Sequence, residues 1–343
     1  YIMTIKEIAA KLSISPSAVS YVLNNKPGVG KELRQKITKL LIENGYSIKT
    51  EANIPQEKKQ YTSPKRTILF LYYISERYLF LRNNSVLTLY LNAIEKICNK
   101  KNCNIITRSV NHDSLYDALS DTDNIDGIIL LGIEFYERVI LDRSCCDKPF
   151  VLLDGFFPES PIDSINVDNY IGLYQAIDYL YQNGHRKIGH IKSAIPYGCL
   201  PDRWRCFYEI LDYFGLSFSQ NHLVEVRMQA ELLQDDIQKY LKENTDYPTA
   251  FFADNDYMAV SALAGIQQAG YSVPDDFSII GFDNIDIATL LKPNLTTISF
   301  DFHGMAQEAV LRLLQLMDNP DLPIIKSTIS PAFIERDSVK NLN

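Results

Sequence analysis

Hydroxyl-bearing and small side chains are concentrated in one short stretch near the start of this 343-residue sequence. They are Ser15, Pro16, Ser17, Ala18, Ser20 and Tyr21, followed by Asn24 and Lys26. Serine hydroxyls bind phosphate oxygens, and the first amides of a helix favour the same negative charge. Small side chains also let a helix lie deep in the major groove of DNA. We therefore expect residues 15–21 to face DNA, with Asn24 and Lys26 contacting its backbone.

The surrounding residues predict three short helices that would position this stretch. Thr4 and Glu7 have the spacing of a capping box, so a first helix is expected from residue 5. After a break at residues 13–14, Ser15 would cap a second helix that Pro16 opens. Apolar residues recur at helical spacing in these two segments and in residues 31–44, where a third helix is expected. They are Ile5, Ile8, Ala9, Leu12, Val19, Val22, Leu23, Leu33, Ile37, Leu40 and Leu41. This pattern predicts a helix-turn-helix unit, although a plain three-helix packing module would share it.

The charge is distributed unevenly along the chain. Residues 1–66 hold 12 Lys and Arg against 5 Asp and Glu, a net charge of +7, whereas residues 67–343 carry a net charge of −15. A basic N-terminal part joined to an acidic remainder is the charge distribution expected of a protein that contacts a polyanion only through its N-terminal part. Short terminal domains also gain excess lysines by chance, so the charge alone does not decide for DNA.

Catalytic and metal-binding motifs are missing from the sequence. It has no H-E-x-x-H, G-x-S-x-G or P-loop motif, and its five histidines are scattered. The six cysteines form no C-x-x-C pair and no zinc-spaced cluster, which favours free thiols in a reducing compartment. No export signal and no apolar run of about 18 residues is present. We therefore expect a cytoplasmic protein that is not an enzyme, with no cofactor, metal or membrane contact.

Residues 3–49 resemble the DNA-binding head of the lactose-repressor (LacI/GalR) family. That head typically begins with an ITIKDIA-like stretch, here MTIKEIA, and continues through V-S-x-x-T-V-S-R-V-L-N, here ISPSAVSYVLN from residue 14. The resemblance implies operator binding by the second helix, and Thr4 is counted among the candidate DNA contacts. Tyr21 stands where the family usually has Arg, so we expect an altered base preference, because Tyr lacks the bidentate fork that reads guanine. Gly30 replaces the Ser that usually caps the third helix.

Residues 47–66 are polar and predict a linker. The family usually forms a hinge helix here, whose Leu wedges into the minor groove. In this chain the Leu position falls near Pro55, with Ile54 beside it, and a proline would interrupt the helix after its first turn. We expect a non-standard hinge that either uses Ile54 as the wedge or forms no helix. The expected division is a DNA-binding domain at 1–50, a hinge at 51–66 and an effector-binding and dimerisation body at 67–343.

Short apolar runs alternate with helical segments in the body. The runs at residues 67–74 (TILFLYYI), 126–131 (DGIILL) and 150–153 (FVLL) are typical of strands buried on both faces. Further strands are expected at 105–108, 187–191, 223–226, 250–253 and 277–282, and helices at 87–99, 171–182, 203–214, 230–242 and 257–269. This alternation predicts doubly wound parallel sheets in two α/β lobes, with a ligand cleft at the carboxyl ends of the strands.

The body resembles the same family, whose body has the fold of periplasmic sugar-binding proteins. The similar blocks are 181–188 (YQNGHRKI), 255–259 (NDYMA), 273–283 (VPDDFSIIGFD) and 293–298 (PNLTTI). The resemblance implies that Arg203 and Asp256 bind the hydroxyls of an effector, with Asp154 nearby and Phe302 as an aromatic wall. Simpler roles stay open: Asp256 as a helix cap, Arg203 paired with an acid between the lobes, and Phe302 as core.

These features predict a repressor that binds palindromic, double-stranded operator DNA as a homodimer and responds to a small effector, a carbohydrate or related metabolite. A stand-alone solute-binding module would suit the body but not the helix-turn-helix head. A sensor of a phosphoprotein co-effector is a further alternative, which the acidic body neither demands nor opposes.

Overall fold

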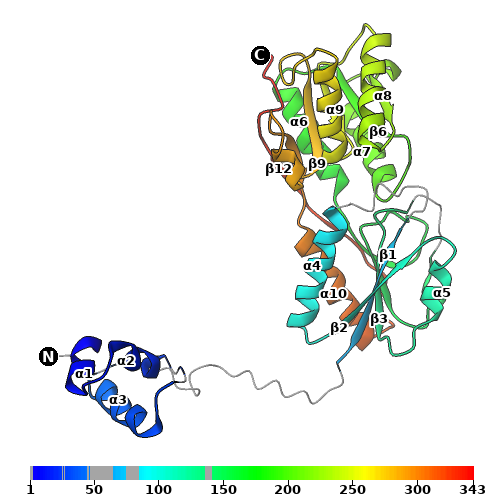
Figure 1. Cartoon of the computed structure of the whole chain (residues 1–343). Coiled ribbons are helices and arrows are strands. Elements are labelled where there is room, and N and C mark those ends of the chain that lie inside the picture. The colour runs from blue at the N-terminus through cyan, green and yellow to red at the C-terminus, as the bar shows by residue number, and fades with distance from the viewer. Residues whose placement is uncertain are drawn as a thin grey trace. The chain divides into compact units, whose positions relative to one another are not determined.

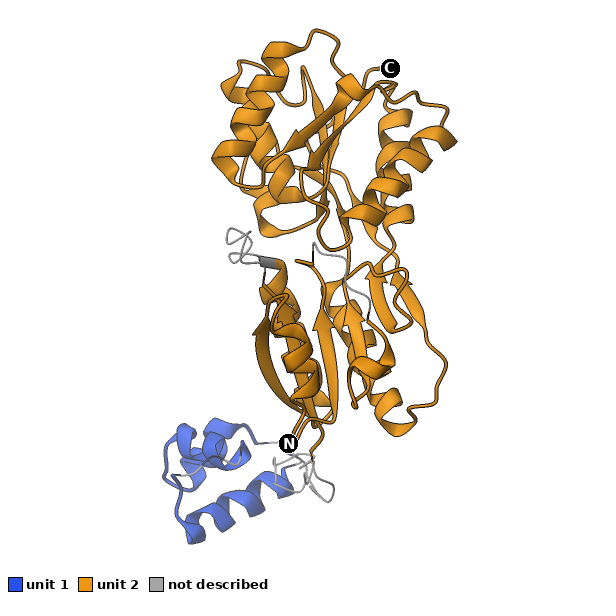
Figure 2. Ribbon diagram, turned by 90° about the vertical axis from the view of Figure 1, so that its right-hand side faces the viewer, with its two compact units in different colours: residues 1–64 blue, residues 65–343 orange. Residues whose placement is uncertain are grey.

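The computed structural model describes residues 3–24, 26, 28–44, 46, 65–74, 85–135 and 141–343. The chain separates into two units, residues 1–64 and 65–343, which Figure 2 colours differently. We call them the head and the body, and describe each by itself. Among the described residues, no helix combines the length and the apolar character needed to cross a membrane.

The head consists of three helices around a small apolar core (Figure 1). They are α1 (Ile5–Lys11), α2 (Pro16–Leu23) and α3 (Lys31–Glu43). The buried core residues come from all three helices: Ile8, Ala9, Val19, Val22, Ile37 and Leu41. The predicted capping box is present, because the Thr4 amide donates to Glu7 Oε2 over 2.7 Å and the Glu7 amide donates to Thr4 Oγ1 over 3.4 Å. The predicted helix-turn-helix arrangement is thus confirmed.

The body begins with a lobe, called lobe 1, built on a six-stranded parallel sheet in the order β11-β5-β4-β3-β1-β2. Its strands are β1 (Thr67–Tyr73), β2 (Asn104–Val110), β3 (Gly127–Leu131), β4 (Phe150–Leu153), β5 (Asp163–Val167) and β11 (Lys326–Ile329). Alternate residues of β1 point to opposite faces: Ile68 and Phe70 share a core with α4 (Ser85–Lys100) and α10 (Phe302–Asp318), whereas Leu69 and Leu71 share one with α5 (Leu115–Ser120). The inner strands are therefore buried on both faces, as their apolar runs predict.

Lobe 2 holds a second six-stranded sheet, in the order β12-β10-β9-β8-β6-β7. Its strands are β6 (Ile188–Ser193), β7 (Leu223–Val226), β8 (Ala250–Ala253), β9 (Ser278–Asp283), β10 (Thr296–Ser299) and β12 (Ala332–Ile334). All pair in parallel except β12, which is antiparallel to β10. The helices form two packed pairs, α6 (Asn169–Gln182) with α7 (Leu200–Tyr213) and α8 (Ala230–Glu243) with α9 (Asp256–Gln268). Short 3-10 helices complete the body at Arg143–Cys145, Gln220–His222 and Asp286–Thr289.

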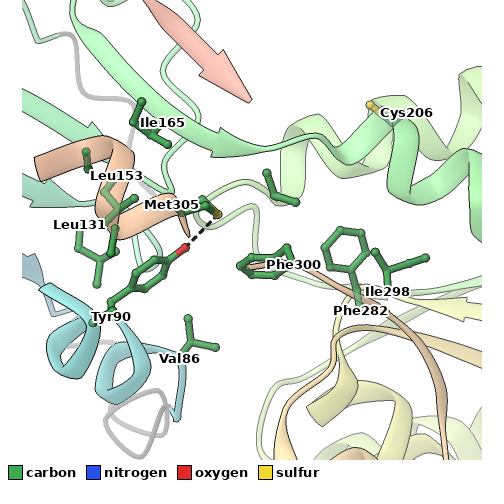
Figure 3. Packing of buried hydrophobic residues seen from close by; sticks show 14 of the residues in the cluster. Val86, Tyr90, Leu131, Leu153, Ile165, Cys206, Phe282, Ile298, Phe300 and Met305 are labelled. Atoms are coloured by element: carbon green, nitrogen blue, oxygen red, sulfur yellow. Dashed lines mark hydrogen bonds between the residues drawn. The ribbon is translucent and has the colours of Figure 1, made fainter. Parts of the chain in front are cut away.

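The chain passes between the lobes three times, after β5, after β10 and after β11. One buried apolar cluster is continuous across these crossings, and Figure 3 shows Tyr90 and Met305 of lobe 1 on one side, with Phe282 and Ile298 of lobe 2 on the other. The predicted fold of two parallel-sheet α/β lobes is confirmed. The sequence reasoning did not anticipate α5, β5, β10, α10, β11 or β12, although β11 and β12 complete the sheets.

Candidate functional site

The hydroxyl-rich surface predicted from the sequence lies on α2 and its first turn. Ser15 is the N-cap, and its Oγ accepts the Ala18 amide over 3.3 Å. Pro16, Ser17 and Tyr21 are exposed, whereas Ala18 and Ser20 are half-buried. Because Val19 and Val22 turn inward to the core, the opposite face of α2 presents small polar groups to solvent. A phosphate at this helix end would meet the backbone amides and the serine hydroxyls together.

The turn after α2 is held against the rest of the head. Asn24 caps the helix end, and its side-chain amide donates to the Ser20 carbonyl over 3.0 Å. Lys26 is exposed, and its carbonyl accepts a hydrogen bond from the Arg34 guanidinium of α3. Tyr21 lies beside Gly28 and exposes 44% of its surface. Lys26 and Tyr21 therefore offer side chains to a partner, whereas the Asn24 amide already has one within the helix.

The remaining predicted DNA contacts differ in position. Thr4 is exposed, but its hydroxyl donates to Glu7 Oε2 over 2.9 Å and so serves α1 itself. Ile54 and Pro55, on which the hinge prediction rests, lie outside the described residues. The third helix has no side-chain cap, as Gly30 predicts.

Arg203, on the first turn of α7, is the central cation of a second candidate site. It is 5% exposed, and its Nε donates to Asn169 Oδ1 over 3.1 Å. One Nη donates to the Asp254 carbonyl, and the guanidinium carbon lies 3.6 Å from the centroid of the Phe282 ring. The same Nη lies 3.9 Å from Asp283 Oδ1. Arg203 therefore faces an acid of its own lobe, rather than the acid between the lobes that the sequence left open.

Asp154 and Asp283 bring carboxylates from both lobes towards Arg203. Burial raises the pKa of Asp154, while hydrogen bonds from Tyr90 and Cys199 and the charge of Arg203 oppose the rise. Burial raises the pKa of Asp283 well above its usual range, against the charge of Arg203. Both residues adopt a positive φ, 52° for Asp154 and 112° for Asp283, a strained conformation that is concentrated at functional sites. We call Asp154, Asn169, Cys199, Arg203, Asp283 and Phe302 the interlobe site.

Phe302, the residue predicted as an aromatic wall, lies next to Tyr90, which binds Asp154. Phe302, half-buried at the start of α10, meets Tyr90 edge-on with ring centroids 5.3 Å apart, and lies 4.2 Å from Phe300. The hydroxyl of Tyr90 donates to Asp154 Oδ2 over 2.9 Å and also contacts Met305, as drawn in Figure 3. Phe302 thus packs against the core, and Tyr90 connects it to Asp154 of the interlobe site.

Asp256 lies apart from the other predicted effector residues. It is fully buried in lobe 2, where its Oδ1 accepts the Thr297 hydroxyl over 2.5 Å and its Oδ2 accepts the Ile285 amide over 3.0 Å. Burial raises the pKa of Asp256 to about 7 despite these hydrogen bonds. It is not the helix cap either, because Asn255 caps α9 by accepting the Met258 amide over 2.8 Å.

A buried polar network supports the Arg203 side of the site. Both carboxylate oxygens of Asp254 accept hydrogen bonds: Oδ1 from His190 Nε2 over 2.7 Å, and Oδ2 from the Trp204 indole over 2.8 Å and the Ser193 amide over 2.9 Å. The Asp254 carbonyl in turn receives Arg203. This network holds the Asp254 carbonyl in place, and that carbonyl orients the Arg203 side chain.

A cavity of about 360 Å³ adjoins the interlobe site at the crossing from β5 to α6. Its lining includes Asn166, Asn169, Cys199, Asp202 and Lys326. Asn169 joins the two regions, since its amide nitrogen donates to Asp202 Oδ2 over 2.9 Å while its oxygen accepts Arg203. The cavity volume is within the range of small-ligand pockets.

Sequence reasoning missed several residues of this region, among them Asp283, Asn169, Cys199 and Tyr90. Asp283 carried the clearest signal, because it directly follows the buried run of β9 and so had to lie at the carboxyl end of a strand.

Comparison with known proteins identifies the architecture. Residues 4–48 match the family described as bacterial regulatory proteins, lacI family, and residues 177–339 match the periplasmic binding protein-like domain. The ribose operon repressor of Haemophilus influenzae is 28% identical over 99% of both chains. The chain thus has a lacI-family regulatory domain near its N-terminus and a periplasmic binding protein-like domain in its body. Another relative, the HTH-type transcriptional repressor CytR of Escherichia coli K12, is 28% identical over 92% of this chain and 89% of its own length.

Solved structures of the lacI family share the fold. The Lac repressor dimer bound to operator and the anti-inducer ONPF has a TM-score of 0.68 at 20% identity, covering 99% of this chain and 100% of that one. A LacI family transcriptional regulator from Enterococcus faecium with bound ribose has a TM-score of 0.65 at 25% identity, covering 81% and 100%. The head and the body of this chain thus both have counterparts in lacI-family regulators.

Proposed function

We propose that this protein is a lacI-family transcriptional repressor that binds a palindromic operator as a homodimer and responds to a small effector at the interlobe site. The observation that carries the proposal is the helix-turn-helix head, whose α2 presents Ser17 and Tyr21 to solvent above a closed apolar core. The named relatives are repressors, so no catalytic activity is proposed. Acting on DNA, such a protein works in the bacterial cytoplasm.

The proposed DNA contacts are those of α2 and the turn that follows it. Ser15, Ser17 and Ser20 would contact phosphates, Tyr21 a base edge or sugar, and Lys26 the backbone. The net charge of +7 over residues 1–66 supports this assignment, because a basic head lowers the cost of approaching the polyanion. Tyr21 in place of an arginine would shift the preferred base at one operator position away from guanine.

The proposed effector is a carbohydrate or related polyhydroxy metabolite. Arg203 donates hydrogen bonds, Asp154 and Asp283 accept them, and Phe302 offers an apolar wall, which together suit hydroxyl groups on a ring. Asp256 would support the site through β10 without touching the ligand, because both its oxygens are already bonded within lobe 2. D-ribose is the first compound to test, since one relative is a ribose operon repressor and another regulator was solved with ribose.

Two exposed apolar places support contact between copies of the body. Leu290 and Leu291 of lobe 2 expose 73% and 41% of their surfaces, and Ile106 on the edge strand β2 of lobe 1 exposes 45%. An edge strand and exposed leucines on a protein of this size are typical of a protein interface. The relative solved on operator is a dimer, and we propose a second copy of this chain as the occupant.

The deciding experiment is selection of DNA from a random pool with the full-length protein, followed by a salt titration of the enriched site. A palindromic site with log affinity falling steeply against log salt supports a dimeric operator-binding protein, because the slope is about −0.9 per phosphate contacted. No enriched site, in the presence or absence of D-ribose, would contradict the proposal. Release or recruitment of DNA by D-ribose would show the direction of control.

A further inference from the structure

The loop between β6 and α7, residues 194–199, makes hydrogen bonds from lobe 2 to lobe 1. The Gly198 amide donates to the Phe135 carbonyl over 2.6 Å. The Cys199 thiol donates to Asp154 Oδ1 over 3.3 Å and lies 3.7 Å from Asn166 Oδ1. All three acceptors belong to lobe 1. The loop therefore links the two lobes by hydrogen bonds, in addition to the three places where the chain itself passes between them.

Gly198 brings two backbones into direct contact. Its φ is +54°, and a Cβ built at this position would lie 2.6 Å from the carbonyl oxygen of Ile133. The obstacle is backbone, which cannot move aside as the end of a flexible side chain can. Any residue other than glycine would therefore force the lobes apart or break the bond to Phe135.

Each partner in this contact is fixed in its own lobe. In lobe 2 the Tyr197 hydroxyl accepts the side-chain amide of Asn255 over 3.1 Å. In lobe 1 the Phe135 ring stacks on Tyr73 with centroids 4.1 Å apart, and meets Phe157 edge-on at 5.1 Å. The bond between Gly198 and Phe135 thus connects two well-packed parts, and a change in the angle between the lobes must break it.

We infer that Gly198 and Cys199, called here the latch residues, hold the two lobes in this arrangement and that the effector competes with them for Asp154. The second half of this inference rests on the proposed function. Asp154 accepts Tyr90 at Oδ2 and Cys199 at Oδ1. The thiol is the weaker of these two donors, so its bond to Oδ1 is the one that a ligand hydroxyl would replace. The latch residues thereby couple occupation of the interlobe site to the angle between the lobes.

The test measures how fast N-ethylmaleimide labels Cys199 in the full-length protein, read by mass spectrometry of the peptide that contains it. Cys199 is 8% exposed and its thiol is bonded to Asp154, so its labelling should become faster when the lobes part. Gly198→Ala is the perturbation, and Gly215→Ala is its matched control, because Gly215 has a φ of +67° with nothing within 4 Å of an added Cβ. We expect Gly198→Ala to speed labelling of Cys199 at least ~10-fold, and Gly215→Ala to leave it near the wild-type rate.

Cys98 provides an internal control, since it is 1% exposed within the apolar core and lies outside the cavity that Cys199 lines, so it should stay slow in every variant. Equal labelling of Cys199 in the two glycine variants would overturn the inference. Where Cys98 also becomes fast, Gly198→Ala has unfolded the body, and hydrogen exchange of the wild type decides instead. A Gly198 amide as protected as those of β6 supports the latch, whereas an unprotected one overturns it. Neither measurement uses DNA or an effector, so their outcome is independent of the proposed function.

Discussion

Replacing Asp256 with Asn is expected to remove a pH-dependent loss of stability. Burial raises the pKa of Asp256 to about 7, whereas in the unfolded chain it returns to about 4. The native state therefore holds its proton more tightly than the unfolded state, and the free energy of unfolding falls as the pH rises from about 4 to about 7. Below that window the protonated carboxyl carries no penalty.

The size of the effect follows from the shift. About 3 pKa units correspond to about 4 kcal/mol, lost at about 1.4 kcal/mol per pH unit. An asparagine has the same shape as the acid and never ionises. Its oxygen can accept the Ile285 amide, and its nitrogen can donate to Thr297, whose hydroxyl already lies 3.4 Å from the Ile298 carbonyl. The variant should thus keep its hydrogen bonds without the buried charge.

The assay is urea unfolding at about pH 5, 6, 7 and 8, followed by the fluorescence of Trp204, the single tryptophan. The difference in unfolding free energy, Asp256→Asn minus wild type, should grow by about 1.4 kcal/mol per unit and level off above about pH 7. Asp154 titrates in both proteins and cancels in the difference. The charge of Asp256 is among the causes that raise the pKa of Asp283, so Asp283 adds to the pH dependence that the substitution removes. A constant difference, together with a loss of D-ribose binding, would refute the reasoning and place Asp256 in contact with the effector.

Three further substitutions address the remaining sites. Ser17→Glu should weaken operator binding at least ~10-fold, measured by fluorescence anisotropy, because it places a negative charge beside the DNA phosphates. Gln35→Glu makes the same change of charge on α3 and should have a smaller effect. Equal effects of the two substitutions would show that α2 does not lie in the groove of the DNA. Arg203→Lys should lower the affinity for the effector ~10-fold or more in a calorimetric titration, because lysine cannot reproduce the hydrogen bond to Asn169. An unchanged affinity for the effector would show that Arg203 is not part of the binding site. Thr4→Ala should destabilise the head by about 1 kcal/mol in amide hydrogen exchange of α1, and unaltered exchange would contradict a role for the capping box.

The head could be predicted almost completely because its signals are local. Thr4, Ser15 and Pro16 mark helix starts through bonds and geometry within a few residues, and the structure places the helix boundaries there. Inner strands with a continuous apolar run, such as FVLL at Phe150–Leu153, were equally predictable, because both of their faces are apolar.

What the sequence did not disclose depends on contacts between distant segments. The last two strands, β11 and β12, are short and mostly solvent-facing, so their hydrophobic pattern is weak, and only pairing with β5 and β10 defines them. Asp283 was missed for a similar reason. Asp256 follows the buried strand β8 and Asp283 ends β9, but Asp256 is bonded by Thr297 whereas Asp283 lies beside Arg203.

The route of the chain between the lobes also sets an order of events on the ribosome. Because β11 completes the sheet of lobe 1 and β12 that of lobe 2, lobe 1 lacks a strand until Ile329 has been synthesised, and lobe 2 until Ile334. The three helices of the head end at Glu43 and can fold while most of the body is still to be made. A nascent chain therefore carries a folded α2 before either lobe of the body is complete, and a message cut short before β11 yields a head on two incomplete lobes.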